Sequence, residues 1–373
     1  MKILILASTP WSIISFRGKL ITYLKKSKFE VHICSPFGEE YKHISKKLEQ
    51  EYNVKTHDIN LKRASFNINS DLRYIYNLIL LLKLIRPHFI LSYTMKPVIF
   101  GSLAGWIMRV PSRNSMITGL GFLFSDSDSI REKIIKNFAK YILRFSIRRN
   151  HNIIFQNNDD KKLFIGNGIA KKSQNFLVTN GSGVDLQYYS EKPLPPNPSF
   201  LLIARMIKNK GIYEYIEAIK IIKKSYSFVS FELLGGLEKN IDAIPIEHIN
   251  EWVIQGLITY HGEVLDVRKA ISKCSIYVLP SYREGTPRSV LEAMSMGRPI
   301  ITTNVPGCKN TVINGVNGYL VEPKNPLSIA NAMKRLINCR ELRDKMGKNS
   351  RKLAEERFND NDVAEKIISQ LIK

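Results

Sequence analysis

The segment SIYVLPSYREGTPRSVLEAM, residues 275–294, combines the patterns of a strand, a loop and a helix. Its first five residues are mainly apolar and β-branched or aromatic, which favours a buried strand. A loop follows over 280–285. We expect Thr286 to cap a helix that runs over 287–296, with proline at the first helical position, where proline is favoured. A buried strand followed by a helix is the repeating unit of a parallel α/β sheet.

The same alternation extends along the whole chain and predicts an α/β protein with two Rossmann-like domains. Strands are expected at 2–7, 30–35, 88–93, 113–117, 152–156, 175–179, 199–204, 228–234, 257–261, 276–280 and 299–303. Helices are expected at 16–27, 70–86, 211–224, 265–272, 287–296 and 326–338. The segment EKPLPPNPSF, 191–200, holds four prolines and reads as a stiff linker between domains 1–190 and 191–360. We expect the two domains to face each other across a cleft, because open parallel sheets bind ligands at the carboxyl ends of their strands.

The charge of the chain predicts an anionic partner. The 373 residues carry a net charge of +23, and residues 1–190 hold 29 Lys and Arg against 13 Asp and Glu. Nucleic acid, phosphorylated small molecules and acidic membranes are the candidate partners. A basic nucleic-acid-binding protein is the alternative of a different class. No helix-turn-helix, zinc finger or aromatic-rich RNA motif supports it, so we expect no nucleic-acid partner.

Cysteine and histidine spacing gives no support for a metal site or a disulfide framework. The four cysteines, Cys34, Cys274, Cys308 and Cys339, are scattered, and none of the seven histidines forms an H-x-x-x-H pair. Unpaired thiols in a reducing cytosol are expected. The opening KILILAS reads as a strand rather than a signal peptide. Charged residues and a proline interrupt the most apolar region, 72–91, so it cannot easily cross a bilayer.

The start of helix 287–296 is a candidate anion site. Backbone amides at Arg288, Ser289 and Val290, with the helix dipole, favour a phosphate there. Glu284 lies in the preceding loop and Glu292 lies inside the helix. Carboxylates accept hydrogen bonds from vicinal hydroxyls, so two of them beside a phosphate suit a nucleotide-sugar. The alternative is a capped helix with two solvated glutamates.

Arg205 and Lys210 follow strand 199–204 in the loop before the next helix. Two cations at the carboxyl end of a strand can pair with a diphosphate, Arg in bidentate fashion and Lys as a point charge. The alternative is a pair of solvated surface cations.

These motifs together resemble the family-four retaining glycosyltransferases, which have the two-domain GT-B fold. The resemblance rests on Glu284-Gly285 followed by SVLEA and GRP, and on four further segments. Those segments are VLPSY (278–282), NVPGC (304–308), VINGVNGYLV (312–321) and LLIARMIKNKGIYEYIEAI (201–219). The resemblance implies that a C-terminal helix near 361–373 returns to the first domain.

The resemblance also implies site roles. Glu284, Arg205 and Lys210 would be the catalytic residues, acting with retention of configuration and without a metal or other cofactor. The remaining donor-binding residues would be Gly262, Glu263, Val264, Leu265, Gly285, Thr286, Arg288, Ser289, Val290 and Glu292, of which the loop 262–265 would meet the nucleobase.

In the first half, SYTMKPVIFGSLAG (92–105) and ITGLG (117–121) resemble a bacterial branch of this family. That branch adds an N-acetylhexosamine to an undecaprenyl-diphosphate-linked saccharide. It implies a UDP-sugar donor carrying GalNAc or GlcNAc, a lipid-diphosphate acceptor, and a cytoplasmic enzyme held peripherally at the inner face of the cell membrane. The alternative is a transferase that uses another nucleotide-sugar and a soluble acceptor.

The first half also departs from the family pattern. A histidine common in the family is absent from 117–121, and TPWSIISFRG (9–18) replaces the usual Gly-Gly loop. The candidates on the acceptor and sugar side are therefore Ser15, Arg17, Lys96, Thr118 and Gly119.

Two further segments in the first half allow more than one interpretation. The segment SDSDS, 125–129, holds an Asp-x-Asp that we interpret as a polar loop, not a metal site. Helix 130–149 carries seven Lys and Arg against one Glu, with Ile134, Ile135, Phe138, Tyr141, Ile142 and Phe145 on one side. That apolar side either packs on the core or contacts anionic lipid.

Overall fold

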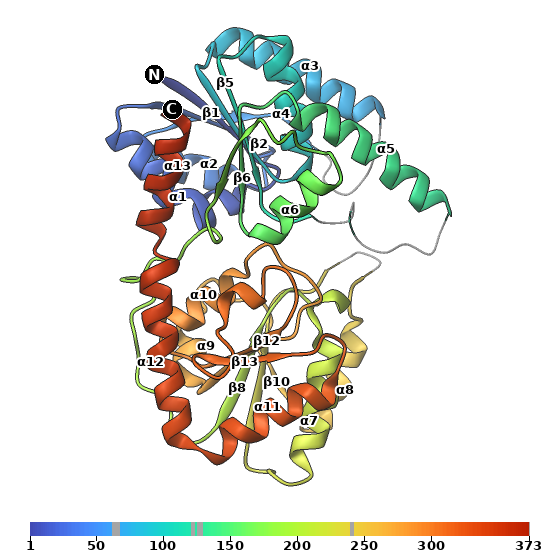
Figure 1. The fold of residues 1–373 in the computed structure, drawn as a ribbon, viewed down its shortest axis with the longest axis vertical. Coiled ribbons are helices and arrows are strands. Elements are labelled where there is room, and N and C mark those ends of the chain that lie inside the picture. The colour runs from blue at the N-terminus through green and yellow to red at the C-terminus, as the bar shows by residue number, and fades with distance from the viewer. Residues whose placement is uncertain (62–67, 121–123, 125–129, 239–241, 373) are drawn as a thin grey trace. The chain divides into compact units, whose positions relative to one another are not determined.

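The structure is a computed structural model that describes residues 1–61, 68–120, 124, 130–238 and 242–372, without the side chains of 130–132. The chain divides into two compact units. Unit 1 comprises Met1–Ser182 together with Asp360–Lys373, and unit 2 comprises Gly183–Asn359. Each unit has a parallel sheet with helices on both faces, as predicted (Figure 1).

The described part of unit 1 contains a seven-stranded sheet in the order β3-β2-β1-β4-β5-β6-β7. All of its strand pairs are parallel. The strands are β1 (Lys2–Leu6), β2 (Glu30–Ser35), β3 (Lys55–Asp58), β4 (Phe89–Tyr93), β5 (Ser112–Ile117), β6 (Asn152–Phe155) and β7 (Asn175–Val178). The strand order reverses between β1 and β4, and at such a switch point the carboxyl edge of the sheet is open to ligands.

Helices cover both faces of this sheet (Figure 1). One layer contains α1 (Pro10–Lys26), α2 (Lys42–Tyr52) and α13 (Asp360–Ile372). The other contains α3 (Ile68–Ile85), α4 (Met95–Ile107), α5 (Ile130–Ile147) and α6 (Asn158–Gly166). Strand β1 separates two cores, since Ile3 and Ile5 pack toward α1 whereas Leu4 and Leu6 pack toward α3 and α4. This alternation is the period of two expected for a strand buried on both faces.

The C-terminal helix α13 returns to unit 1, as predicted. Its residues Val363, Ile367 and Leu371 are buried in the same core as α1. The hydroxyl of Tyr23 on α1 donates to Asn361 Oδ1 at 3.1 Å. The end of the chain therefore completes the core in which its beginning is buried.

The described part of unit 2 contains a six-stranded parallel sheet in the order β10-β9-β8-β11-β12-β13. The strands are β8 (Ser199–Ile203), β9 (Ser230–Leu234), β10 (Thr259–Tyr260), β11 (Ile276–Leu279), β12 (Ile300–Thr303) and β13 (Gly318–Val321). The helices are η2 (Lys208–Lys210), α7 (Ile212–Lys223), α8 (Ile246–Ile254), α9 (Arg268–Lys273), α10 (Arg288–Ser295), η3 (Lys309–Thr311), α11 (Pro326–Asn338) and α12 (Arg340–Arg357). The order reverses between β8 and β11, so unit 2 repeats the topology of unit 1.

The proline-rich segment that was predicted as a linker lies against unit 2. The Pro193 carbonyl accepts a hydrogen bond from the buried Arg298 at 3.1 Å. The Pro196 carbonyl accepts one from the buried Arg343 at 3.4 Å. The segment has no regular structure before Ser199, as its prolines require, but these bonds make it part of unit 2.

Among the described helices, none is both long and apolar enough to serve as a membrane span. Cys34, Cys274 and Cys308 are buried free thiols, and Cys339 is an exposed one.

Candidate glycosyl-transfer site

The loop after β11 places Glu284 at the carboxyl edge of the unit 2 sheet. The Tyr282 amide donates to the Asn209 carbonyl at 2.9 Å, and the Glu284 amide donates to the Pro306 carbonyl at 3.2 Å. The loop is thereby bonded to the segments that follow β8 and β12. Gly307 has a φ of +84°, and a Cβ there would lie 2.2 Å from the Glu284 carbonyl oxygen. Only a glycine allows the two loops to approach this closely.

Two of the predicted catalytic residues meet directly. Lys210, at the end of η2, forms an ion pair with Glu284 Oε1. The Ser281 hydroxyl donates to the same oxygen at 2.8 Å. The Lys210 and Glu284 side chains are 17% and 14% exposed, so this pair is largely shielded from water. Ser281 was not predicted, and its only sequence signal was its place in the VLPSY segment.

Arg205 lies on the same edge but has a different partner. It follows β8, and its Nη1 lies 2.8 Å from Glu238 Oε1. The Arg205 side chain is 57% exposed, so the guanidinium can exchange this carboxylate for another anion at low cost. The described contacts do not join Arg205 to the Lys210–Glu284 pair.

The start of α10 differs from the prediction. The helix begins at Arg288, and Pro287 is its capping residue, with extended backbone at ψ 114°. The predicted capping role of Thr286 is therefore wrong, because its hydroxyl donates to the Gly285 carbonyl at 2.9 Å. The predicted anion site also loses one amide, since the Val290 N–H donates to the Pro287 carbonyl at 3.2 Å.

Glu292 is buried inside unit 2, not solvated. Arg288 Nε donates to Glu292 Oε1 at 3.0 Å. Burial raises the pKa of Glu292, and this rise is opposed by Arg288 and by a hydrogen bond from the Tyr189 hydroxyl. Burial, together with the Glu292 carboxylate, also raises the pKa of Tyr189. A buried carboxylate with a raised pKa and charged and polar neighbours is typical of a functional position.

Ser289, the next donor-side candidate, faces the end of β8. Its hydroxyl donates to the Ile203 carbonyl at 3.3 Å, and the Tyr277 hydroxyl donates to the same carbonyl at 3.1 Å. The first turn of α10 is thus tied to the strand that leads to Arg205.

The loop 262–265 lies beside two glycines that the sequence analysis did not select. The Gly235 amide donates to the Gly262 carbonyl at 2.8 Å. A Cβ on Gly235 would lie 1.8 Å from the Ala204 carbonyl oxygen, and one on Gly236 would lie 2.8 Å from Glu263 Oε2. The side chains of Val264 and Leu265 are exposed, so a ligand could contact them. The Gly-Gly pair directly after a predicted strand was the signal available for this feature.

In unit 1, Arg17 is buried at the carboxyl edge of the sheet. Its guanidinium carbon lies 4.9 Å from the centroid of the Tyr93 ring, and the Tyr93 hydroxyl lies 3.1 Å from Ser12 Oγ. Burial raises the pKa of Tyr93 to about 12. Thr94 follows with a φ of +66°, and its hydroxyl donates to Ser8 Oγ at 2.8 Å. A positive φ is costly for threonine, so this turn is a strained feature that the sequence pattern did not reveal.

The other predicted acceptor-side residues also lie near the carboxyl edge of the unit 1 sheet. No described contact joins them to one another. The buried Lys96 pairs with Asp71 Oδ1 at 2.7 Å. Ser15 is half-buried on α1, and Thr118 and Gly119 follow β5, the latter with a φ of +151°. Gly121 and the segment 125–129 lie outside the described residues. In the part of the chain that is described, no group of three or more His, Cys, Asp or Glu could hold a metal ion.

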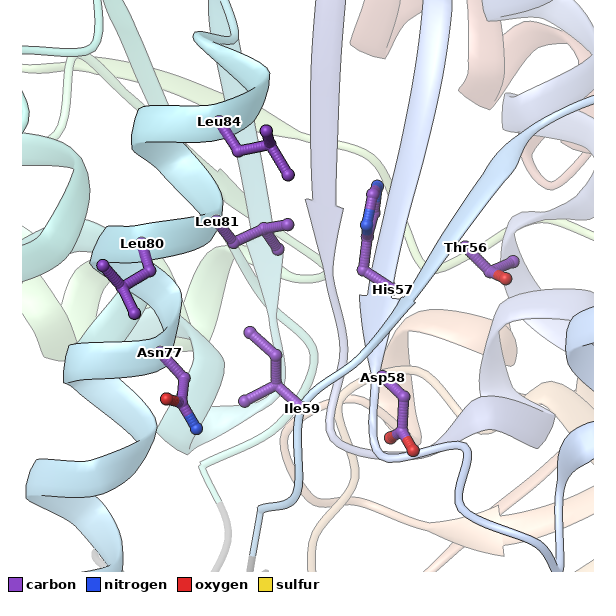
Figure 2. A pocket seen from close by; sticks show the side chains of 8 residues that line it. All are labelled: Thr56, His57, Asp58, Ile59, Asn77, Leu80, Leu81 and Leu84. Atoms are coloured by element: carbon purple, nitrogen blue, oxygen red, sulfur yellow. The ribbon is translucent and has the colours of Figure 1, made fainter.

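An open hollow of about 460 Å³ lies elsewhere in unit 1, between α3 and the edge strand β3. Figure 2 shows Leu80, Leu81 and Leu84 on α3 and His57 on β3 among its walls. It contains none of the predicted site residues.

Comparison with known proteins finds a matching family model in each half of the chain. The family model described as glycosyl transferases group 1 matches residues 190–353, and the one described as glycosyl transferase 4-like matches residues 2–157. The capsular polysaccharide biosynthesis glycosyltransferase CapM of Staphylococcus aureus is 31% identical, over 99% of this chain and 96% of CapM.

A second relative is an N,N'-diacetylbacillosaminyl-diphospho-undecaprenol alpha-1,3-N-acetylgalactosaminyltransferase from Campylobacter jejuni. It is 28% identical over 99% of this chain and 97% of its own length. The structure of Anabaena HepE in complex with UDP superposes with a TM-score of 0.78, covering 100% of both chains at 19% identity. At that identity the likeness shows the fold alone. The chain therefore belongs to the group 1 glycosyl transferases, and it is a glycosyltransferase with the GT-B fold.

Proposed function

We propose that the protein is a retaining glycosyltransferase that moves an N-acetylhexosamine, GalNAc or GlcNAc, from a UDP-sugar to an undecaprenyl-diphosphate-linked saccharide. Such a reaction belongs to the assembly of a cell-surface glycan. The Lys210–Glu284 pair at the carboxyl edge of unit 2 is the observation that carries the proposal. The names of the relatives from Staphylococcus and Campylobacter support the substrate class.

Unit 2 is the proposed donor-binding unit. Breaking the bond between sugar and nucleotide leaves charge on the departing diphosphate, and fixed cations stabilise that charge. We assign this role to Arg205, Lys210 and the amides at the start of α10. The nucleobase would lie against the loop 262–265, and Glu292 would accept hydrogen bonds from the ribose.

Glu284 would orient the transferred sugar. Its carboxylate is fixed by Lys210 and Ser281, and it can accept hydrogen bonds from sugar hydroxyls. It is not assigned as a general acid, because a departing diphosphate needs no proton, unlike the glycosidic oxygen in hydrolysis. The leaving phosphate would instead take the proton of the acceptor hydroxyl on the same face of the sugar, which retains the configuration.

Unit 1 is the proposed acceptor-binding unit, at the inner face of the cell membrane. Arg17 and Lys96 are buried cations near the carboxyl edge of its sheet and suit a lipid-linked diphosphate. Ser15, Thr118 and Gly119 are the candidates for contacts with the acceptor sugar.

Replacement of Glu284 tests the proposal. We expect Glu284→Gln to lower the rate of transfer from UDP-GalNAc or UDP-GlcNAc to a lipid-diphosphate saccharide by roughly 10²–10³-fold, the effect of removing one preorganised polar contact. The variant should keep the circular dichroism spectrum of the parent and should still bind UDP, because Arg205, Lys210 and the α10 amides remain in place. Glu217→Gln, at an exposed position on α7, is the matched control. Full transfer by Glu284→Gln would contradict the assigned role.

Chelation tests the metal-free mechanism. The positive charge for the leaving group comes from protein side chains, so transfer should continue at the parent rate in EDTA. A loss of activity that magnesium restores would show that Arg205 and Lys210 do not supply this charge by themselves.

A panel of UDP- and GDP-sugars tested with lipid-linked and soluble acceptors separates the proposal from its nearest alternative. Transfer from a UDP-N-acetylhexosamine to the lipid-linked saccharide is expected. Transfer only to soluble acceptors would favour the alternative.

A further inference from the structure

Helix α5 exposes an apolar ridge that unit 1 does not cover. Its core side is formed by Ala139, Leu143 and Ile147. The opposite side carries Ile134, Phe138, Tyr141 and Phe145, of which Phe138 is 64% and Tyr141 is 69% exposed. We call these four residues the α5 ridge. One interpretation of this helix was that its apolar side packs on the core of the domain. That interpretation is wrong for the four ridge residues, whose large side chains are exposed to solvent.

The ridge continues onto the end of α4. Trp106 is partly exposed and packs edge-on against Phe145, with ring centroids 6.0 Å apart. The guanidinium carbon of Arg149 lies 4.1 Å from the Phe145 centroid and 4.8 Å from that of Trp106. Aromatic rings combined with an arginine in this way suit the boundary between hydrocarbon and water, where the rings are buried and the cation remains hydrated.

Cations flank the ridge in the part of α5 whose side chains are described. Residues 133–149 include six Lys and Arg, of which Lys136 is buried, and contain no Asp or Glu. A helix with this charge is complementary to an anionic surface. Apolar side chains lie between the cations, which favours a lipid bilayer over a nucleic acid as that surface.

A hollow on each side of the ridge combines cations with an aromatic ring. One, of about 380 Å³, is lined by Lys140, Arg144 and Tyr141 among others. The other, of about 590 Å³, is lined by Trp106, Arg109 and Arg113 among others. Both have the size and charge to accept the phosphate of a lipid headgroup while the ridge enters the layer beneath it.

The position of α5 relates this surface to the proposed acceptor site. Strand β5 ends at Ile117 and the parallel strand β6 follows α5, so α5 begins at the carboxyl edge of the unit 1 sheet. Thr118 and Gly119 are at that edge. Within the ridge, Ile134 is nearest to that edge and Phe145 is farthest from it. A lipid whose tail lies in a membrane under the Ile134 end would therefore have its diphosphate near the acceptor candidates of the same unit.

We infer that the α5 ridge, with Trp106 and the flanking cations, is a surface that docks the enzyme on a bilayer containing anionic phospholipid. This inference deepens the proposed function, which places the acceptor at a membrane. Helix α3, on the same face of the sheet, adds exposed apolar residues, Leu72, Tyr76, Leu80 and Leu84, to this helical layer.

The first experiment measures binding of the full chain to vesicles, without any sugar substrate. Sedimentation with vesicles of phosphatidylcholine and phosphatidylglycerol should remove the protein from solution. Vesicles of phosphatidylcholine alone should not, and high salt should weaken the binding. Equal binding to both kinds of vesicle, unaffected by salt, would overturn the role of the cations.

Matched variants locate the surface. Phe138→Glu should lower the vesicle partition coefficient roughly tenfold or more, because it removes a large apolar side chain and adds a repelled charge. Phe228→Glu, at a phenylalanine of unit 2 that is 67% exposed, should bind as the parent does. Equal binding by both variants would overturn the assignment.

A charge reversal gives a second measurement. Lys140→Glu with Arg144→Glu should lower the partition coefficient by roughly thirtyfold or more, since each cation near an anionic surface contributes about 1 kcal/mol. The control is Lys345→Glu with Lys348→Glu, two exposed lysines of α12, which makes the same change in net charge. Equal effects of the two pairs would mean that net charge, and not this surface, governs binding.

Two further outcomes separate this inference from others. If sedimentation velocity shows a dimer of the parent that Phe138→Glu dissociates, the ridge binds a second copy and the lipid assignment fails.

Transfer to a water-soluble short-chain acceptor should be unchanged in Phe138→Glu. If the parent binds vesicles as expected but transfers no sugar, the proposed function fails while the docking surface stands.

Discussion

At the residue scale, two glutamates of one motif have different environments. Glu284 is in a loop and has its charge balanced by Lys210. Glu292 is buried in a helix, where burial raises its pKa in spite of Arg288. The environment of Glu292 makes a carboxylate costly, which natural proteins accept mainly where a ligand needs it.

Glu292→Gln should therefore change stability in a pH-dependent way. The folded-state pKa of Glu292 lies above its ordinary value of 4.5, so the folded protein binds this proton more tightly than the unfolded chain does. The contribution of Glu292 to the free energy of unfolding thus falls as pH rises from 4.5 through the folded pKa. Glutamine does not titrate, so the stability of Glu292→Gln relative to the parent should increase over that range.

Chemical denaturation of both proteins at a series of pH values measures this difference. A difference that stays constant with pH, or decreases as pH rises, would contradict the raised pKa. The same variant should bind UDP more weakly if Glu292 contacts the ribose.

The sequence motifs indicated which residues lie at the candidate site. They did not indicate which of those residues form ion pairs or hydrogen bonds with one another. Spacing placed Lys210 and Glu284 at carboxyl ends of strands, and in the structure they form an ion pair. Neither spacing nor composition could show that Arg205 pairs with Glu238, because that contact depends on how two loops fold back. The capping prediction for Thr286 was wrong because the Pro287 backbone is extended, which starts the helix one residue later.

At the element scale, the loops of unit 2 are positioned by glycine contacts. Gly307 packs on the backbone of the Glu284 loop, and Gly235 packs on the loop after β8. These are backbone contacts between loops that follow different strands, so the geometry of the site depends on positions that contribute no functional group.

Gly307→Ala should destabilise the protein and impair transfer together. Its φ is +84° and the new Cβ would meet the Glu284 carbonyl oxygen at 2.2 Å. Gly315→Ala is the matched control, because Gly315 has a φ of +79° and open space around its Cβ position.

The control should cost about 1 kcal/mol of unfolding free energy through its backbone alone. Gly307→Ala should cost about 1–3 kcal/mol more, because the loop must move. Thermal and urea denaturation measure the costs, and equal values for the two variants would show that the contact does not constrain the loop.

Elements with strong patterns were predictable and weakly patterned ones were not. The buried strands β1, β8 and β11 are continuous apolar runs, and all three were predicted. Strand β3 was missed because its sequence, KTHD, is polar and it forms an edge of the sheet. The start of α1 was expected at 16 but lies at Pro10, since proline favours the first turn of a helix.

At the scale of the whole molecule, unit 1 is built from two distant parts of the chain. Helix α13 buries Ile367 and Leu371 against α1 and is tied to β6 by a hydrogen bond from Gln370 to Asn152. The stability of the N-terminal unit should therefore depend on the C-terminal residues.

Ile367→Ala tests this dependence. Ile367 is 1% exposed, and truncating such a side chain should cost about 2–5 kcal/mol. Ile372→Ala, on the same helix but 52% exposed, should cost well under 1 kcal/mol. Hydrogen exchange should show the loss of protection in β1 and β2 of unit 1. Loss confined to unit 2 would contradict the described packing.

The discontinuity of unit 1 also has a consequence for biosynthesis. A ribosome makes β1 before unit 2, but the core around β1 lacks residues 360–372 until all of unit 2 has been translated. Unit 1 therefore remains incompletely folded while unit 2 is translated, and part of its apolar surface is accessible to chaperones during that time. A premature stop codon or a bulky fusion near α13 would then destabilise unit 1 more than unit 2, although unit 2 directly precedes α13 in the sequence.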